Sequence, residues 1–267
     1  MDPTLIGILL AVGALIGIAA GLLGIGGGMI AVPFMTFVFS ALHFPADQIV
    51  HMAIATSLAT ILFTSISSVY AHHRRGAVLW PVMAKLAPGI VLGSLAGARI
   101  ASALPSRVLA SVFALFVSVA AMQILVDRKP RPNRALPGTA GLVGAGAVIG
   151  VLSAIVGAGG AFISVPFMTW CNVRIHSAVA TAASLGFPIA AAGTIGYAVA
   201  GYHEVEIPGA IGYVHIPAML SLAVASVLTA PLGARIAHSL DTRRLKSVFA
   251  GMMFLLAGYM LYRAAAG

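Results

Sequence analysis

The segment Gly24-Ile25-Gly26-Gly27-Gly28, followed by Pro33-Phe34-Met35-Thr36, interrupts a strongly apolar part of the chain. The second half repeats this arrangement as Gly157-Ala158-Gly159-Gly160-Ala161, followed by Pro166-Phe167-Met168-Thr169. Glycine and proline disfavour helix interiors, so both segments predict helices that stop within an apolar environment. Paired interruptions at corresponding positions of a duplicated membrane protein indicate a ligand site near the middle of the bilayer.

The composition indicates a membrane protein. Hydrophobic residues make up 60% of the chain, charged residues 8%, and the mean hydropathy is +1.05. Such a chain would not stay dissolved as a globule, and a spanning helix needs about 20 apolar residues. We predict an all-α polytopic membrane protein whose apolar segments are 4–23, 29–42, 50–71, 79–103, 107–126, 138–156, 161–172, 176–200, 213–238 and 243–263. The second and seventh segments are short, and each follows a glycine break.

An internal duplication extends beyond the glycines. Equivalent pairs recur in the same order, which makes coincidence a poor explanation. We predict a first membrane repeat at 1–126, a basic cytoplasmic linker at 127–137 and a second membrane repeat at 138–267. Each repeat would hold a Gly-broken pair of re-entrant or short helices and three spanning helices. The pairs are Pro33 with Pro166, 51–56 with 176–181, 97–101 with 233–237, and 111–114 with 247–250.

Charge asymmetry predicts how the repeats are oriented. The formal net charge of +9 is concentrated in short connections, at Arg74-Arg75, 128–134 and 243–246, as in cytoplasmic loops of membrane proteins. If each Gly-broken pair returns to its starting side, an outside N-terminus places all three clusters inside and Glu204 outside. The two repeats are then inverted relative to each other. Arg107 is the exception, because this topology places it outside.

The quoted residues resemble the sulfite exporter TauE/SafE family of membrane proteins. The resemblance rests on 24–28 with the following Val32-Pro33, on the copy at 157–166, on Ala55-Thr56-Ser57-Leu58 and on Gly97-Ala98-Arg99. It covers essentially the whole chain. The resemblance implies a multi-pass transporter of small anions, with sulfite and organosulfonates such as sulfoacetate as the associated substrates.

The glycine breaks are the predicted substrate-binding site. A helix that begins in mid-membrane exposes its first N–H groups and the positive end of its dipole, and glycine lets a ligand approach that backbone. We therefore expect Gly26, Gly27 and Gly28 to face Gly159 and Gly160 across a central chamber. The alternative is close helix packing, since small residues are common where membrane helices meet.

Hydroxyl groups on the following segments are further candidates. Thr56 and Ser57 in the first half and Thr181 in the second could donate hydrogen bonds to an oxyanion without adding charge. Such side chains also commonly bond back to a carbonyl of the preceding turn. Both interpretations stay open for these three residues.

Histidine and lysine supply the candidate charged groups. His51 and His176 are equivalent and could couple transport to protons, because histidine titrates near neutral pH. The alternative is that both are interfacial residues at helix starts. Lys85 lies inside an apolar segment and could attract anions, although snorkelling to the interface beside Trp80 is the competing interpretation.

Other classes of protein find little support. The acidic residues fall in or beside connections, which disfavours cation carriers that need a carboxylate in the membrane. The single cysteine, Cys171, and the lack of a His-Glu-x-x-His motif predict no metal site, no cofactor and no enzyme activity. We expect an alternating-access carrier in the bacterial inner membrane; the alternative is a passive anion channel. Its partners would be the small anion and the lipid bilayer, with no nucleic acid; a homodimer is possible.

Overall fold

The computed structural model describes residues 3–23, 28–126, 135–239 and 242–266. The predicted all-α polytopic fold is confirmed, because the helices coincide with the apolar segments of the sequence. Among the described residues, five helices (α3, α4, α5, α6 and α8) are long and apolar enough to cross a membrane. The helices are α1 (Pro3–Leu23), α2 (Gly28–Ala41), α3 (Ile49–His73), α4 (Trp80–Ser102), α5 (Ser106–Val126), α6 (Thr139–Val156), α7 (Ala161–Trp170), α8 (Ile175–Ala200), α9 (Ile216–Ser239) and α10 (Thr242–Ala266).

A small hairpin precedes α9, and the sequence analysis did not predict it. Strands β1 (Ala210–Ile211) and β2 (Val214–His215) pair antiparallel, with Ala210 opposite His215. Each strand has two residues, too few to produce the alternation of apolar and polar residues that signals a strand. Gly212 turns the hairpin at a φ of 54°, within the left-handed region that favours glycine.

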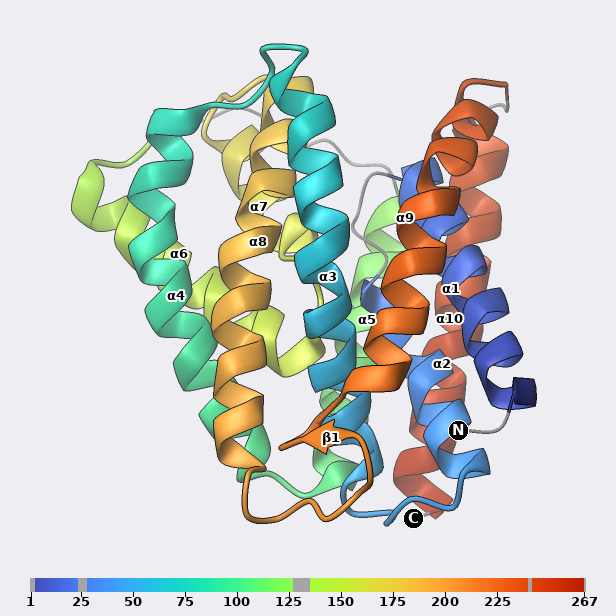
Figure 1. Ribbon diagram of the computed structural model, residues 1–267. Coiled ribbons are helices and arrows are strands. Elements are labelled where there is room, and N and C mark those ends of the chain that lie inside the picture. The colour runs from blue at the N-terminus through green and yellow to red at the C-terminus, as the bar shows by residue number, and fades with distance from the viewer. Residues whose placement is uncertain (1–2, 24–27, 127–134, 240–241, 267) are drawn as a thin grey trace.

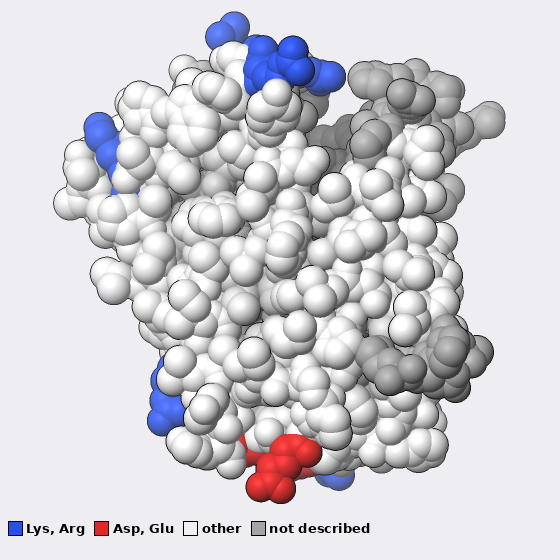
Figure 2. All heavy atoms as spheres, viewed as in Figure 1, with Lys and Arg blue, Asp and Glu red and all other residues white. Residues whose placement is uncertain are grey.

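The helices connect two ends of the molecule, which are the upper and lower ends in Figure 1. Helix α1 rises from the lower end and α2 returns to it, whereas α6 and α7 start and finish at the upper end. Helix α3 ends at the upper end and its sequence equivalent α8 ends at the lower end. Basic side chains gather at the α3–α4 connection and acidic side chains beside the β1 hairpin, so the described charges lie mainly at the two ends (Figure 2).

Helices α3 and α8 form the centre of the bundle. Every residue from 49 to 61 of α3 is buried, and α3 packs against α8, α2 and α9. The remaining pairs join the two halves of the sequence, because α1 packs on α9, α4 on α6 and α5 on α10. Large apolar side chains such as Leu92 and Leu228 are exposed on the outer helices, as expected for surfaces that face lipid.

Glycine allows α4 and α6 to approach closely. A Cβ atom added to Gly93 would lie 2.1 Å from the carbonyl oxygen of Ala147, and one added to Gly150 would lie 2.4 Å from that of Ile90. These glycines pack helices together, as small residues commonly do where membrane helices meet. Gly144 differs, because it is exposed and a Cβ there would contact nothing within 4 Å.

Candidate functional site

The second glycine break interrupts the chain between α6 and α7. Helix α6 ends at Val156, and Gly157 follows in the left-handed conformation with a φ of 70°. Gly160 is also left-handed, with a φ of 75°, and α7 begins at Ala161. The first break lies between Leu23 and Gly28, the end of α1 and the start of α2. Its residues 24–27, which include the candidates Gly26 and Gly27, lie outside the described part of the chain.

The two breaks lie against each other. A Cβ added to Gly28 would be 2.6 Å from the carbonyl oxygen of Gly157 and 3.2 Å from Cα of Ala158. Ser57 joins the two breaks, since its Oγ lies 3.3 Å from the carbonyl oxygen of Gly28 and 3.2 Å from that of Gly157. Its one proton is shared between these acceptors. Gly28 and Ser57 therefore hold the breaks together in this conformation.

The start of α7 carries amides without acceptors. The carbonyl oxygen of Ser153 accepts the amides of Gly157 and Ala158, which closes α6. The carbonyl oxygen of Gly160 accepts the amides of the next turn, those of residues 163 and 164. Between these two sets, the four amides of residues 159–162 donate to no acceptor within the described part of the chain. These are the orphan donors that a helix N-terminus offers to an anion.

Two features beside these amides were missed by the sequence analysis. A Cβ added to Gly159 would find only Cγ2 of Ile61 within 4 Å, at 3.9 Å, so there is room beside this glycine. The hydroxyl of Ser153 is 1% exposed and has no hydrogen-bond partner among the described residues. Its Oγ lies 3.0 Å from the position of a Cβ on Gly160. Its place one turn before the break was the only signal in the sequence.

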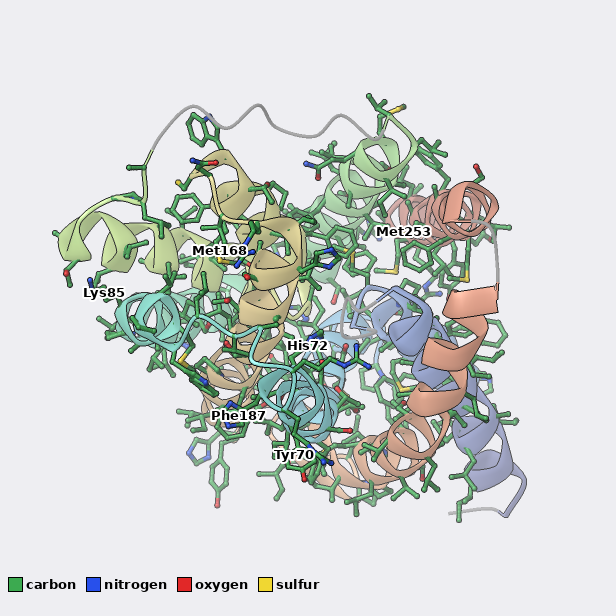
Figure 3. The ribbon with its side chains drawn as sticks, turned by 90° about the horizontal axis from the view of Figure 1, so that it is seen from above. Tyr70, His72, Lys85, Met168, Phe187 and Met253 are labelled. Atoms are coloured by element: carbon green, nitrogen blue, oxygen red, sulfur yellow. The ribbon has the colours of Figure 1, made fainter. Side chains whose placement is uncertain are left out.

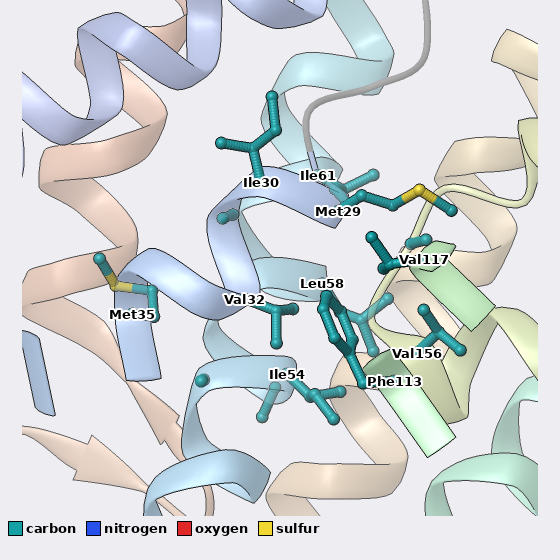
Figure 4. Close-up of a cluster of buried hydrophobic side chains, with 14 of the residues drawn as sticks. Met29, Ile30, Val32, Met35, Ile54, Leu58, Ile61, Phe113, Val117 and Val156 are labelled. Carbon is teal, nitrogen blue, oxygen red and sulfur yellow. The ribbon is translucent and has the colours of Figure 1, made fainter. Parts of the chain in front are cut away.

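Apolar side chains surround the breaks. Figure 4 shows Val32 of α2, Ile54 and Leu58 of α3 and Val156 of α6 converging near Gly28 and Gly157. A central chamber there stays a prediction, and one cavity among the described residues lies at the lower end of the bundle. Gly28 and Gly157 are thus closely packed, whereas there is room beside Gly159.

Thr56 and Thr181 bind backbone groups of the opposite half. The hydroxyl of Thr56 accepts the amide of His215 at 3.1 Å, just before α9 begins. The hydroxyl of Thr181 accepts the amide of Leu79 at 3.0 Å, just before α4 begins. Both threonines are fully buried. The equivalent residues thus make equivalent contacts, one with each of two connections that lie at opposite ends of the molecule.

The two candidate histidines have different surroundings. His51 is 4% exposed, and its Nε2 lies 3.1 Å from the carbonyl oxygen of Ala101 and 3.0 Å from that of Leu104. Nδ1 lies 3.2 Å from the Oγ of Ser106. His176, by contrast, is exposed at the first turn of α8. The interfacial interpretation therefore fits His176 better than His51.

Lys85 lies on the outside of the bundle. It is exposed, and the view from above places it on α4 at the outer edge, away from the central helices (Figure 3). This position suits a lysine that reaches the interface along an apolar helix. It does not bring the ammonium group to the glycine breaks.

A cavity of about 870 Å³ opens beside the start of α3. Its lining includes His51, Ser106 and Arg107 from the first half, and Glu204 and Tyr213 from the second. The hydroxyl of Tyr213 donates to a carboxylate oxygen of Glu204. Burial, followed by this bond, raises the pKa of Tyr213 above its ordinary value. The phenol therefore stays protonated and ties the hairpin to the preceding loop.

His215 closes the hairpin onto α9. Its Nδ1 accepts the amide of Ala218 at 3.2 Å, so the ring acts as an N-terminal cap of the helix. The rings of Phe39 and Phe44 lie beside it, with centroid distances of 5.6 and 5.7 Å. Burial lowers the pKa of His215. The neutral ring is the form that can accept this hydrogen bond.

The helical bundle and its apolar outer surface are those of a multi-pass membrane protein. The sequence profile of the family described as sulfite exporter TauE/SafE matches residues 9–260. The chain belongs to this family, as the sequence analysis predicted.

Relatives with curated names are described as transporters. A "Probable membrane transporter protein" of Haemophilus influenzae is 32% identical over 257 residues, which cover 95% of this chain and 97% of the relative. A protein of the same description from Methanocaldococcus jannaschii is 26% identical, covering 96% of each chain. The comparison with solved structures finds no significant match.

Proposed function

We propose that this chain is a secondary transporter that carries a small anion across the bacterial inner membrane by alternating access. The anion is sulfite or an organosulfonate such as sulfoacetate. The amides of residues 159–162, which find no acceptor among the described residues, carry the proposal, because successive N–H groups and the positive end of the α7 dipole attract negative charge. The family's name, sulfite exporter, supports the same class of substrate.

Two inverted repeats provide the machinery in this proposal. Three observations support the inversion: α3 and α8 run in opposite directions (Figure 1), α1 pairs with α9 as α6 pairs with α4, and Thr56 and Thr181 make equivalent contacts. Inverted repeats can exchange their conformations, so that one state opens outward and the state related to it by the pseudo-two-fold axis opens inward. The end that carries Arg74 and Arg75 faces the cytoplasm.

The other candidate residues have secondary roles in the proposal. Thr56, Ser57 and Thr181 bind backbone groups here, so they would meet substrate only in a conformation in which these bonds are open. His51 and His176 are the proposed groups for proton coupling, and His51 is the one with buried partners. Lys85 would act at the surface, by raising the local concentration of anions.

Transport by Gly159 variants in sealed proteoliposomes tests the proposal. A Cβ on Gly159 would lie no closer than 3.9 Å to its nearest neighbour, Cγ2 of Ile61, so we expect Gly159→Leu to fold, to fill the space next to these amides and to lose most uptake of sulfite or sulfoacetate. Gly159→Ala should show a smaller loss. The matched control is Gly144→Leu, because Gly144 is an exposed helix glycine with nothing nearby, and it should transport normally.

Counterflow separates the carrier from the passive channel. In vesicles preloaded with unlabelled anion, a carrier exchanges the internal anion for external labelled anion and so accelerates its entry. A channel shows no such acceleration. Normal transport by a folded Gly159→Leu variant would show that the binding site lies elsewhere. Flux without counterflow would support the channel.

A further inference from the structure

We infer that the hydroxyl of Ser153 and the first amides of α7 together form a hydrogen-bonding pocket for a singly charged oxyanion. In this arrangement the second break supplies the donors, and the first break closes against it. The inference rests on the proposed function and deepens it by naming a ligand contact and the charge of the ligand.

Ser153 differs from most buried hydroxyls of the described residues, because it has no hydrogen-bond partner among them. Buried hydroxyls in helices commonly donate to a carbonyl of the preceding turn. Thr36, Thr60 and Ser164 do so, at 2.9, 2.8 and 2.9 Å from the carbonyl four residues earlier. Ser153 donates to no described group although it is 1% exposed. A buried polar group without a partner is unfavourable, so an unfilled donor here points to a missing acceptor.

The hydroxyl is directed at the start of α7. Its Oγ lies 3.0 Å from the position of a Cβ on Gly160, and only glycine leaves that position open. The free amides of residues 159–162 begin at the same place, and the room beside Gly159 adjoins them. An oxyanion carries several acceptor oxygens, and a set of amide and hydroxyl donors matches it without a cation.

The two halves contribute unequally. In the first half, the hydroxyl at the break is that of Ser57, whose proton is engaged with the carbonyl oxygens of Gly28 and Gly157. The position equivalent to Ser57 is Ala182, and the position equivalent to Ser153 is Ala20 (153 − 133 = 20). Each hydroxyl thus occurs in one half alone. Ser57 holds the breaks together, and Ser153 is left to bind a ligand.

The surroundings limit the charge of that ligand. Apart from the hydroxyls of Ser57 and Ser153, the side chains that approach the second break are apolar, among them Ile61, Ile149, Ile189 and, in Figure 4, Val156. No charged side chain is among the described neighbours of these glycines. The cost of removing an ion from water grows with the square of its charge. Hydrogensulfite or a monosulfonate is therefore favoured over sulfate.

The test measures binding of methanesulfonate and of sulfate to the purified full-length protein at equal ionic strength, by calorimetry and by thermal shift. Wild-type protein should bind methanesulfonate more tightly than sulfate. Ser153→Ala should weaken methanesulfonate binding about 10- to 100-fold, as expected for a hydrogen bond to a charged group. Its unfolding temperature without ligand should stay equal or rise, because the variant removes an unpaired buried hydroxyl.

Two further variants make the result specific. Thr194→Val removes another hydroxyl oxygen that has no described partner, on α8 and about 12 Å along the helix from Gly186, which borders Gly159. It should bind methanesulfonate like wild type. Ser153→Cys keeps the size and a weak donor, and it should bind with intermediate affinity.

The outcomes separate this inference from the proposed function. If no anion binds the wild-type protein, both are wrong. If the wild type binds anions and Ser153→Ala binds them equally well, or if Ser153→Ala loses stability and affinity together, the role of Ser153 is wrong and the anion site survives. Tighter binding of sulfate than of methanesulfonate would refute the single charge.

Discussion

Two glycines in equivalent motifs have different functions at the scale of single residues. Gly28 is required by close contact, because an added Cβ would meet the backbone of the other break at 2.6 Å. Gly159 has open space beside it instead. The sequence analysis treated both as ligand-binding glycines. The structure supports the packing interpretation for Gly28, whereas ligand binding at Gly159 and Gly160 stays a prediction.

His215 should make the lower end of the bundle sensitive to acid. Burial lowers its pKa in the folded state from the ordinary 6.5, so the unfolded chain binds a proton more readily. The stabilisation is therefore present above pH 6.5 and is lost as the pH falls below 6.5 toward the folded-state pKa. A protonated ring would also lose the bond from the Ala218 amide and place a positive charge at a helix N-terminus. Thermal unfolding across this pH range measures the loss.

The variant His215→Asn isolates this effect. Asparagine at the same position can accept the α9 amide and does not titrate. As the pH falls, the unfolding temperature of the wild type should decrease more than that of the variant. A constant difference across the range would contradict the assignment to His215.

At the scale of whole elements, the crossed threonine contacts fix the start of one helix in each half. Thr56→Val keeps the shape of the side chain and leaves the amide of His215 buried without its acceptor. The expected loss of stability is about 1–3 kcal/mol. Thr181→Val removes the corresponding bond to Leu79 and should cost a similar amount. Denaturation of the purified variants measures both losses.

The positions of the two variants give a second test. Thr56→Val should loosen the connection before α9 and increase the reactivity of cysteines placed near the lower end. Thr181→Val should loosen the connection before α4 and increase the reactivity of cysteines placed near the upper end. Equal changes at both ends for both variants would show that these bonds act on the bundle as a whole.

The helices were predictable from the sequence because each lies in an apolar segment bounded by Gly, Pro or charged residues. The glycine breaks were predictable for the same reason. The β1–β2 hairpin was not, since two-residue strands leave no periodic signal. Ser153 was missed because its hydroxyl becomes unusual only in three dimensions, through the absence of a partner. The partners of Thr56 and Thr181 are 159 and 102 residues away, beyond the reach of local patterns.

At the scale of the molecule, the proposed topology can be tested with cysteines. Arg75 lies in the α3–α4 connection and Glu206 in the loop before β1. In a Cys171→Ser background, Arg75→Cys should react with a membrane-impermeant maleimide only from the cytoplasmic side, and Glu206→Cys only from the opposite side. Intact and inverted vesicles measure the two accessibilities.

A cysteine in the lipid-facing surface is the control. Leu92 on α4 is 67% exposed, so Leu92→Cys should react poorly from either side because it faces hydrocarbon. Labelling of Arg75→Cys and Glu206→Cys from the same side would rule out a Gly-broken pair that returns to its starting side. The count of crossings would then need revision.

The glycine-lined approach of α4 to α6 joins elements from the two predicted repeats. A single repeat produced alone would present a strip of bare main chain with nothing to cover it. Such a fragment could bury that strip only by pairing with a second copy inserted in the opposite orientation in the same bilayer. Co-expression of the two separate halves should therefore restore the assembled bundle, which neither half can form alone.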